Sequence, residues 1–369
     1  MADFQLNIDC EGPLTQNDNA FELCQEFIPS GGAFFSIVSK YDDFLADVVH
    51  KPGYKAGDTL RLVLPFLKAF DVTHEMMERF SEKTLLLLPG TEIMLPKLNG
   101  LLSSFIISTS YRPYIEALCN LTSFPMEHCY CTSVDLDQYS IEERERKQLR
   151  KLAKEIAQLE MLNWADDAKT IEDLDKRHQE TIKRLDEIFW KIIPSMSIGK
   201  ILEDVNPVGG IEKAKAVEDS IKRTGLELNR VIYAGDSITD WQALDLVRGA
   251  GGVAISFNGN RYAIKSAEYA IISSNTCIIY GICSLILNGG REIFQKVSID
   301  KKGKFDLQEL LEKMDKISLE EEIFKQIYDS AQKEELEIYH IERSDMEKLC
   351  SVSEKVRKEV RGHRIGELG

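Results

Sequence analysis

The sequence has no long apolar run and no excess of basic charge. No segment approaches the roughly 18 consecutive apolar residues of a membrane helix, and the most apolar late stretch, residues 276–287, is too short. The first residues carry no basic cluster, so we expect no signal peptide. With 46 basic against 61 acidic residues, the net charge of −15 would repel a nucleic acid. We therefore expect neither a membrane nor a nucleic acid as a partner.

The cysteines also lack the spacings that usually identify a cysteine site. There are eight, without paired C-x-x-C motifs and without the dense framework of a small secreted domain. His128, Cys129 and Cys131 are close in sequence and could suggest a metal site. A C-x-C strand, however, points both thiols to one face, which favours simple packing. We expect a reducing, cytoplasmic compartment.

The length predicts more than one structural unit. A chain of 369 residues exceeds the ~250–300 residues that a single core usually reaches. Hydrophobic residues make up 43% of the chain, which is enough for a large core. We therefore expect two or three units.

A pair of aspartates follows an apolar run in the second half of the chain. Residues 231–234 are apolar, and the glycine-led segment after them carries Asp236 and, four positions later, Asp240. Mg²⁺ prefers oxygen ligands and is usually held by one or two carboxylates together with substrate phosphate. Open α/β sheets bind ligands at the carboxyl ends of their strands. Asp236 and Asp240 are therefore candidate ligands of a divalent cation.

A second segment of this kind lies near the N-terminus. Residues 4–8 alternate apolar and other side chains and end at Asp9, with Glu11 and Gly12 close behind. An aspartate at a strand end and an acid two residues later suit a nucleophile and a proton donor. Such short patterns also occur by chance in loops, so neither segment identifies a site by itself.

Two further segments lie between these in the chain. Residues 105–107 form an apolar strand that ends in Ser108 and Thr109, whose hydroxyls suit hydrogen bonds to a phosphoryl oxygen. Residues 207–213 form a glycine turn that delivers Lys213 at the start of a helix. The order along the chain is therefore aspartate, serine, lysine and an aspartate pair.

This order resembles the four motifs of the haloacid dehalogenase (HAD) superfamily of phosphohydrolases. The similar positions are residues 9–13 for the first motif, Ser108 for the second, Lys213 for the third, and Gly235, Asp236 and Asp240 for the fourth, GDxxxD. Together they extend over roughly half of the chain.

Two branches of the superfamily are similar in detail. Residues 108–112 resemble the second motif of the phosphoserine-phosphatase-like branch, although Thr109 and Ser110 stand where that branch has glycines. The variant motif at residues 9–15 and the long tail resemble an uncharacterised archaeal branch. Members of that branch are sometimes labelled a subunit associated with an energy-converting hydrogenase.

The resemblance implies a two-step phosphoryl transfer on a small phosphorylated metabolite. Asp9 would attack phosphorus to form an aspartyl-phosphate, and Glu11 would protonate the leaving oxygen and then assist water. Mg²⁺ would bridge Asp9, the backbone carbonyl of Glu11 and Asp236 to the phosphate. Asp240 would bind the ion directly or support its ligands. The phosphoryl oxygens would be held by Gly12, Ser108, Thr109 and Lys213.

The first motif departs from the family pattern at two positions. Glu11 stands where aspartate is usual, and one extra methylene moves the carboxyl far enough to cost about 100-fold in rate. Pro13 replaces a threonine and removes a backbone N–H donor, with Thr15 two positions later as a possible substitute. These changes keep the nucleophile and the metal ligands, so we expect retained but slow chemistry, and loss of catalysis stays open.

The spacing of the motifs predicts a core with insertions. We expect an α/β fold whose HAD-like Rossmannoid core, with a parallel sheet, is formed by residues 1–17, 84–138 and 195–290. The periodicity of apolar positions predicts a helical cap at 18–83, a helical hairpin at 139–194 and a charged helical extension at 291–369.

Three functions stay open. The first is a Mg²⁺-dependent phosphatase of a small phosphomonoester. The second is an accessory protein that keeps the fold and binds a partner, or a second copy, through residues 291–369. The third is a phosphotransferase, because an aspartyl-phosphate can be discharged to a hydroxyl other than water. The substrate itself is not predicted, because fold does not imply function.

Overall fold

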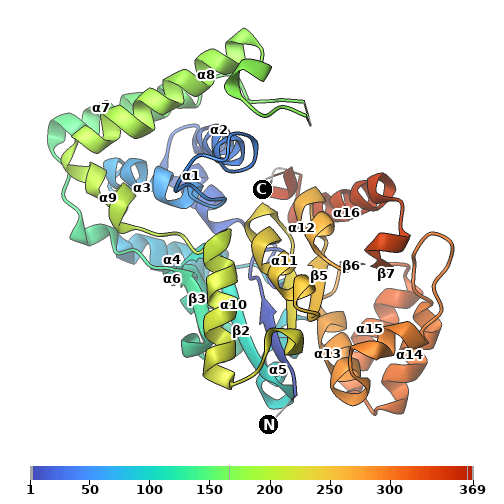
Figure 1. Ribbon diagram of the computed structural model, residues 1–369. Coiled ribbons are helices and arrows are strands. Elements are labelled where there is room, and N and C mark those ends of the chain that lie inside the picture. Colours follow the sequence, from blue (N-terminus) through green and yellow to red (C-terminus); the bar gives the residue numbers. More distant parts are fainter. Residues whose placement is uncertain (1–2, 166, 364, 368–369) are drawn as a thin grey trace.

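One seven-stranded sheet forms the centre of the protein, with helices on both of its faces (Figure 1). The computed structural model describes residues 3–165, 167–363 and 365–367. The strand order is β3-β2-β1-β4-β5-β6-β7. The strands are β1 (Gln5–Ile8), β2 (Ser103–Tyr111), β3 (Cys129–Thr132), β4 (Val231–Gly235), β5 (Val253–Phe257), β6 (Tyr269–Ser273) and β7 (Leu336–His340).

The central strands are parallel and buried on both faces. Every residue of β1, β4, β5 and β6 is buried. This is why the sequence of these strands is a nearly continuous apolar run rather than an alternation of apolar and polar residues. The prediction of an α/β fold with a mostly parallel, Rossmann-type sheet is confirmed.

The chain reverses its direction of travel across the sheet between β1 and β4. From β1 it proceeds to β2 and β3 on one side, and from β4 to β5 and β6 on the other, so β1 and β4 are neighbours. Ligands of open α/β sheets bind outside the carboxyl ends of the strands at such a point. Asp9 follows β1 and Asp236 follows β4 directly. Segments more than two hundred residues apart in sequence therefore meet there.

Helices connect the strands of the core. They are α5 (Thr91–Leu101), α6 (Arg112–Thr122), α10 (Ile211–Thr224), α11 (Trp241–Gly249), α12 (Arg261–Ser266) and α13 (Cys277–Gly289). α13 is buried along nearly its whole length, which explains the apolar stretch at 276–287. In the described part of the chain, no helix has both the length and the apolar character to cross a bilayer.

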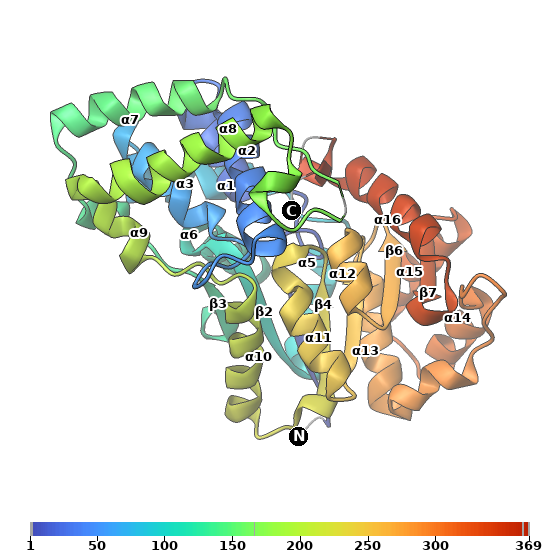
Figure 2. The ribbon, with the colours of Figure 1, turned by 45° about the horizontal axis from the view of Figure 1, so that its top comes forward.

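The segments predicted as the cap (18–83) and the hairpin insertion (139–194) form a helical layer beyond the carboxyl ends of the strands (Figures 1 and 2). Residues 198–205, which were predicted as part of the core, pack with this layer. Its helices are α1 (Asn19–Phe27), α2 (Gly31–Asp43), α3 (Thr59–Ala69), α4 (His74–Thr84), α7 (Glu143–Ile156), α8 (Lys176–Glu187) and α9 (Ile201–Asp204). Phe66 of α3, Leu149 of α7 and Leu185 of α8 belong to one apolar cluster. An ion pair of 2.5 Å between Arg184 and Glu155 joins α8 to α7. The insertion therefore enlarges the core of the cap.

The C-terminal segment differs from its sequence prediction in one respect. It contains the expected helices α14 (Leu307–Lys316), α15 (Glu321–Gln332) and α16 (Met346–Arg361), but also β7, which pairs antiparallel with β6. Ile338 of β7 is fully buried and belongs to the same apolar cluster as β1 and β6. The sequence did not predict β7, because five residues between charged runs are too short to indicate a strand. The strand forms because the edge of β6 provides its hydrogen-bonding partner.

Candidate active site

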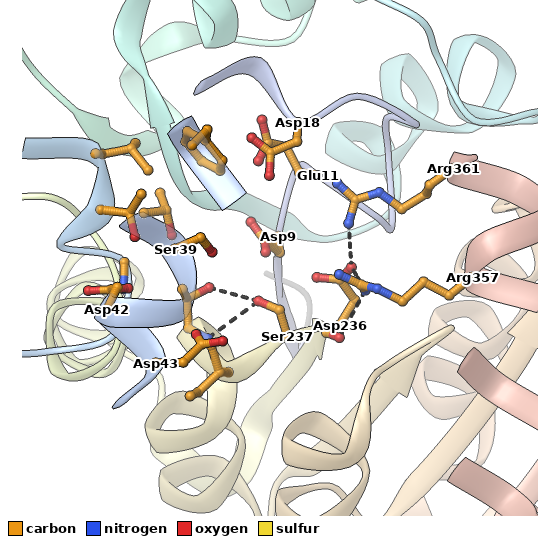
Figure 3. Close-up of a pocket in the computed structure, with 17 residues that line it drawn as sticks. Asp9, Glu11, Asp18, Ser39, Asp42, Asp43, Asp236, Ser237, Arg357 and Arg361 are labelled. Carbon is orange, nitrogen blue, oxygen red and sulfur yellow. Dashed lines mark hydrogen bonds and ion pairs between the residues drawn. The ribbon is translucent and has the colours of Figure 1, made fainter. Parts of the chain in front are cut away.

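A small cavity lies where the carboxyl ends of β1 and β4 face the cap. Its volume is about 80 Å³, well below the ~300–1,000 Å³ of pockets that enclose whole ligands. A space of this size fits a single small group. Its lining residues include Asp9, Glu11, Asp18, Asp42, Thr109, Asp236, Arg357 and Arg361 (Figure 3).

Asp9 is positioned by a tight turn after β1. Leu14 and Thr15 both donate their backbone N–H to the carbonyl of Cys10, at 2.9 and 3.0 Å, and Cys10 donates its own N–H to Asp9 Oδ1 at 2.7 Å. Gly12 has a φ of 103°, and a Cβ built there would lie 2.1 Å from Asp236 Oδ2. Glycine is therefore required at this position, because the two motifs approach each other so closely.

Lys213 is fully buried and bridges two of the predicted carboxylates. Its Nζ lies 2.7 Å from Asp9 Oδ2 and 2.7 Å from Asp240 Oδ1. Burial disfavours the charge of this lysine, but the carboxylates of Asp240 and Asp9 outweigh burial and raise its pKa. The turn at Gly209 and Gly210 makes this possible, because Gly210 has a φ of 55° immediately before α10.

Asp240 organises the loop that follows β4. Its Oδ2 accepts the backbone N–H groups of Asp236 and Ser237, each at 3.1 Å. Its Oδ1 accepts Lys213 and, at 2.8 Å, the hydroxyl of Tyr233. Burial opposes its charge, but these partners together lower its pKa. Both oxygens are thus engaged within the protein, which favours a supporting role for Asp240 over a direct one.

Glu11 lines the cavity, where its surroundings favour the neutral form of its carboxyl. Burial and the nearby carboxylate of Asp18 raise the pKa of Glu11 to about 8, against an opposing contribution from Arg361. Its Oε1 accepts the backbone N–H of Asn19 at 2.8 Å, at the first residue of α1. The longer side chain is therefore accommodated by reaching the start of the cap.

The two hydroxyls of the second motif have different surroundings. Ser108 is 1% exposed and forms hydrogen bonds with Ser110, donating to its Oγ at 3.1 Å and accepting its N–H at 3.2 Å. Thr109 lines the cavity, and its Oγ1 is buried without a hydrogen-bond partner among the described residues. Of these two hydroxyls, that of Thr109 is thus the one without a partner in the described part of the chain.

The cap contributes further carboxyl groups to the cavity wall. Asp18 precedes α1, and Asp42 and Asp43 end α2. Burial raises the pKa of Asp42 to about 8, with Asp58 adding to the effect, and burial also raises the pKa of Asp18 and Asp43. The cap side of the cavity is therefore lined by carboxyl groups that burial favours in the neutral form.

Arg357 and Arg361 are components of the site that the sequence motifs did not predict. They project from α16 toward Asp236 (Figure 3). Arg357 Nη1 donates to Asp236 Oδ2 and, at 3.1 Å, to its backbone carbonyl, while Arg361 Nη1 lies 3.1 Å from Oδ2. A signal was present in the sequence: the two arginines are four positions apart, which places both on one face of a helix.

The donor set fits a hard divalent cation. Carboxylate oxygens of Asp9, Asp236 and Asp240 lie within 4.8 Å of one another, and within the described residues this is the group suited to a metal. The segment 128–131 is not such a group: Cys129 contacts Cys119, with their Sγ atoms 3.5 Å apart, and His128 packs on Phe105.

The chain matches known proteins by family model and by structure. Residues 108–281 match the model for haloacid dehalogenase-like hydrolases. Gene product AF1437 from Archaeoglobus fulgidus is 30% identical, with a TM-score of 0.78 over 100% of this chain and 99% of that one. An apo phosphoserine phosphatase has a TM-score of 0.45 at 13% identity, over 75% of this chain and 97% of that one. Comparison with curated proteins finds no match.

The family match agrees with the motif order and with the sheet that brings the motifs together. It includes Ser108, Lys213, Asp236 and Asp240, and Asp9 lies beside them on the neighbouring strand end. The chain thus belongs to the haloacid dehalogenase-like hydrolases.

Proposed function

We propose that this protein is a phosphatase that hydrolyses a small phosphomonoester through an aspartyl-phosphate on Asp9. The observation that carries the proposal is the contact of Lys213 with Asp9, whose side chain lines a small cavity together with Glu11, a carboxyl with a pKa raised to about 8. A nucleophile, a fixed positive charge and a proton donor are the groups that phosphoryl transfer requires.

Asp9 must be ionised to attack phosphorus. Burial and the carboxylate of Asp240 raise its pKa, and Lys213 opposes them. Additional positive charge is therefore needed to keep the nucleophile ionised and to offset the charge of the phosphoryl group. Bound Mg²⁺, held by Asp9 and Asp236 and by the carbonyl of Glu11, would supply that charge and polarise a phosphoryl oxygen.

The remaining residues would position the phosphoryl group and move protons. Lys213 and the Thr109 hydroxyl would hold phosphoryl oxygens, with Ser108 supporting the strand end. Glu11 would donate its proton to the leaving oxygen and then, as a carboxylate, accept a proton from the water that attacks the aspartyl-phosphate. The small volume under the cap favours exclusion of bulk water during both steps.

The accessory function is the second candidate, because Asp236, which lines the cavity, is paired there with two arginines. A protein partner or second copy at residues 291–369, a hydrogenase association, an archaeal origin, a cytoplasmic location and phosphotransfer between metabolites all stay predictions.

The test is hydrolysis of an aryl phosphate by the purified full-length protein, with Mg²⁺ and with EDTA. Asp9→Asn removes the nucleophile, and Asp329→Asn, at an exposed position on α15, is the matched control. We expect metal-dependent turnover that Asp9→Asn abolishes and Asp329→Asn leaves intact. Turnover that survives Asp9→Asn would reject the covalent mechanism. Absence of turnover across a panel of phosphorylated metabolites would favour the accessory function.

A further inference from the structure

The last turns of α16 form ion pairs with the active site through Arg357 and Arg361. Arg357 is 2% exposed and Arg361 is 9% exposed, although arginine is rarely buried without a partner. Arg361 donates from Nε to the carbonyl of Gln16 at 3.2 Å and from Nη2 to the carbonyl of Asn17 at 2.6 Å. The last turn of α16 therefore contacts both the loop after Asp9 and the carboxylate of Asp236.

The first turns of α16 are anchored in a different way. Leu349 and Cys350 belong to an apolar cluster with strands of the sheet. Ser353 donates its hydroxyl to the carbonyl of Gly259 at 2.7 Å. These contacts do not involve Asp236. The arginine end of the helix can therefore release the carboxylate while the first half of α16 stays packed.

Each of the three carboxylates of the cation site already has a buried cationic partner. The three carboxylates of Asp9, Asp236 and Asp240 face three buried cationic side chains. These are Lys213, Arg357 and Arg361. Both guanidinium groups contact Oδ2 of Asp236, so a divalent cation bound to this carboxylate would lie close to two positive charges. Positive charges this close together repel each other strongly in a buried site.

We propose that Arg357 and Arg361 occupy Asp236 in place of a divalent cation, so that Mg²⁺ binding and the docking of these arginines exclude each other. When Mg²⁺ binds, the guanidinium groups leave Oδ2. The C-terminal helix is then a positioning element of the cation site. This inference rests on the cation site of the proposed function, but not on turnover.

The first test is a calorimetric titration of the full-length protein with Mg²⁺. Arg357→Gln removes one competing charge and keeps a hydrogen-bonding side chain. Lys355→Gln is the matched control, because Lys355 is on the same helix with a side chain 75% exposed. We expect Mg²⁺ to bind Arg357→Gln at least about tenfold more tightly than wild type and Lys355→Gln to bind it as wild type does. Equal or weaker binding by Arg357→Gln, or no binding by any variant, would overturn the proposal.

The second test uses the wild-type protein and does not depend on the folding of a variant. Hydrogen exchange of the backbone amides of residues 353–361 is compared without Mg²⁺ and at saturating Mg²⁺. We expect faster exchange with Mg²⁺, because the ion pairs that hold this end of α16 are lost. Unchanged exchange at saturation would overturn the proposal.

Both readouts are independent of catalysis. Coupled Mg²⁺ binding in a protein without phosphatase activity would keep this inference and reject the proposed function. If the protein turns over substrate but Arg357→Gln binds Mg²⁺ with wild-type affinity, the proposed function is kept and this inference is rejected.

Discussion

Replacing Lys213 with methionine should test the electrostatics of the site most directly. The side chain is fully buried, and its Nζ lies 2.7 Å from one oxygen of Asp9 and 2.7 Å from one of Asp240. Removing one partner of a buried ion pair costs about 3–5 kcal/mol, because the other charge is left uncompensated. Since domains are typically stable by only ~5–15 kcal/mol, we expect Lys213→Met to lower the free energy of unfolding severely.

The loss of unfolding free energy in Lys213→Met should depend on pH, because the carboxyl groups left without Lys213 titrate. Without Lys213, burial keeps the folded-state pKa of Asp9 above its unfolded value, as it already does in the wild type. A group of this kind stabilises the fold fully below the unfolded pKa, and the stabilisation is lost as pH rises through the folded pKa. Lys213→Met should therefore cost least near about pH 4 and more toward about pH 8.

The assay is urea unfolding of the full-length protein at both pH values. Lys215→Met, two residues along α10 with a side chain 59% exposed, is the matched control and should change stability little. The double variant Lys213→Met/Asp240→Asn should be less destabilised than the sum of the two single variants, because it removes a carboxylate that Lys213→Met leaves unpaired. A cost under about 1 kcal/mol, or one that is additive with Asp240→Asn, would refute the reasoning.

Three further predictions concern the turn, the acid and the cap. Glu11 must be protonated to act as an acid, so kcat/KM of the wild type should fall as pH rises through about 8. Glu11→Gln should lower the rate by about 10²–10⁴-fold. A wild-type kcat/KM that does not change with pH would contradict this role. Gly12→Ala should lower the urea midpoint more than Gly53→Ala, because both glycines have positive φ but only at Gly12 does a Cβ meet another atom. Asp42→Asn should stabilise the protein against urea above about pH 8 and have little effect near about pH 4, because burial raises the folded-state pKa of the Asp42 carboxyl. Equal effects of the substitution at both pH values would show that the charge of Asp42 is not what destabilises the fold.

Much of the site could be predicted from local sequence. Asp9, Glu11 and Asp236 each follow or lie near the end of an apolar strand, and parallel strands bring their carboxyl ends to one edge of a sheet. Lys213 follows a glycine turn at the start of a helix. Patterns of this kind depend on neighbours in sequence, so they can be read without knowledge of the fold.

For the second motif, the local sequence does not predict which hydroxyl lies at the cavity. Ser108 matches the family position, but the structure places its hydroxyl against Ser110, whereas Thr109 lines the cavity and its hydroxyl has no hydrogen-bond partner among the described residues. Successive side chains of a strand point to opposite faces, so a shift of one residue decides which hydroxyl a ligand meets. Only the exact end of β2 settles that.

The sequence by itself determined the α/β class, the order of the motifs and the chemistry of a carboxylate site with one lysine. Tertiary structure decided that β7 joins the sheet and that Arg357 and Arg361 reach Asp236. The physical reason is distance along the chain: the partner of β7 is β6, more than sixty residues earlier, and the partner of each arginine is a carboxylate more than a hundred residues earlier. A charged helix has the same local pattern whether its arginines face solvent or a buried aspartate, and only the packing of α16 on the sheet distinguishes the two.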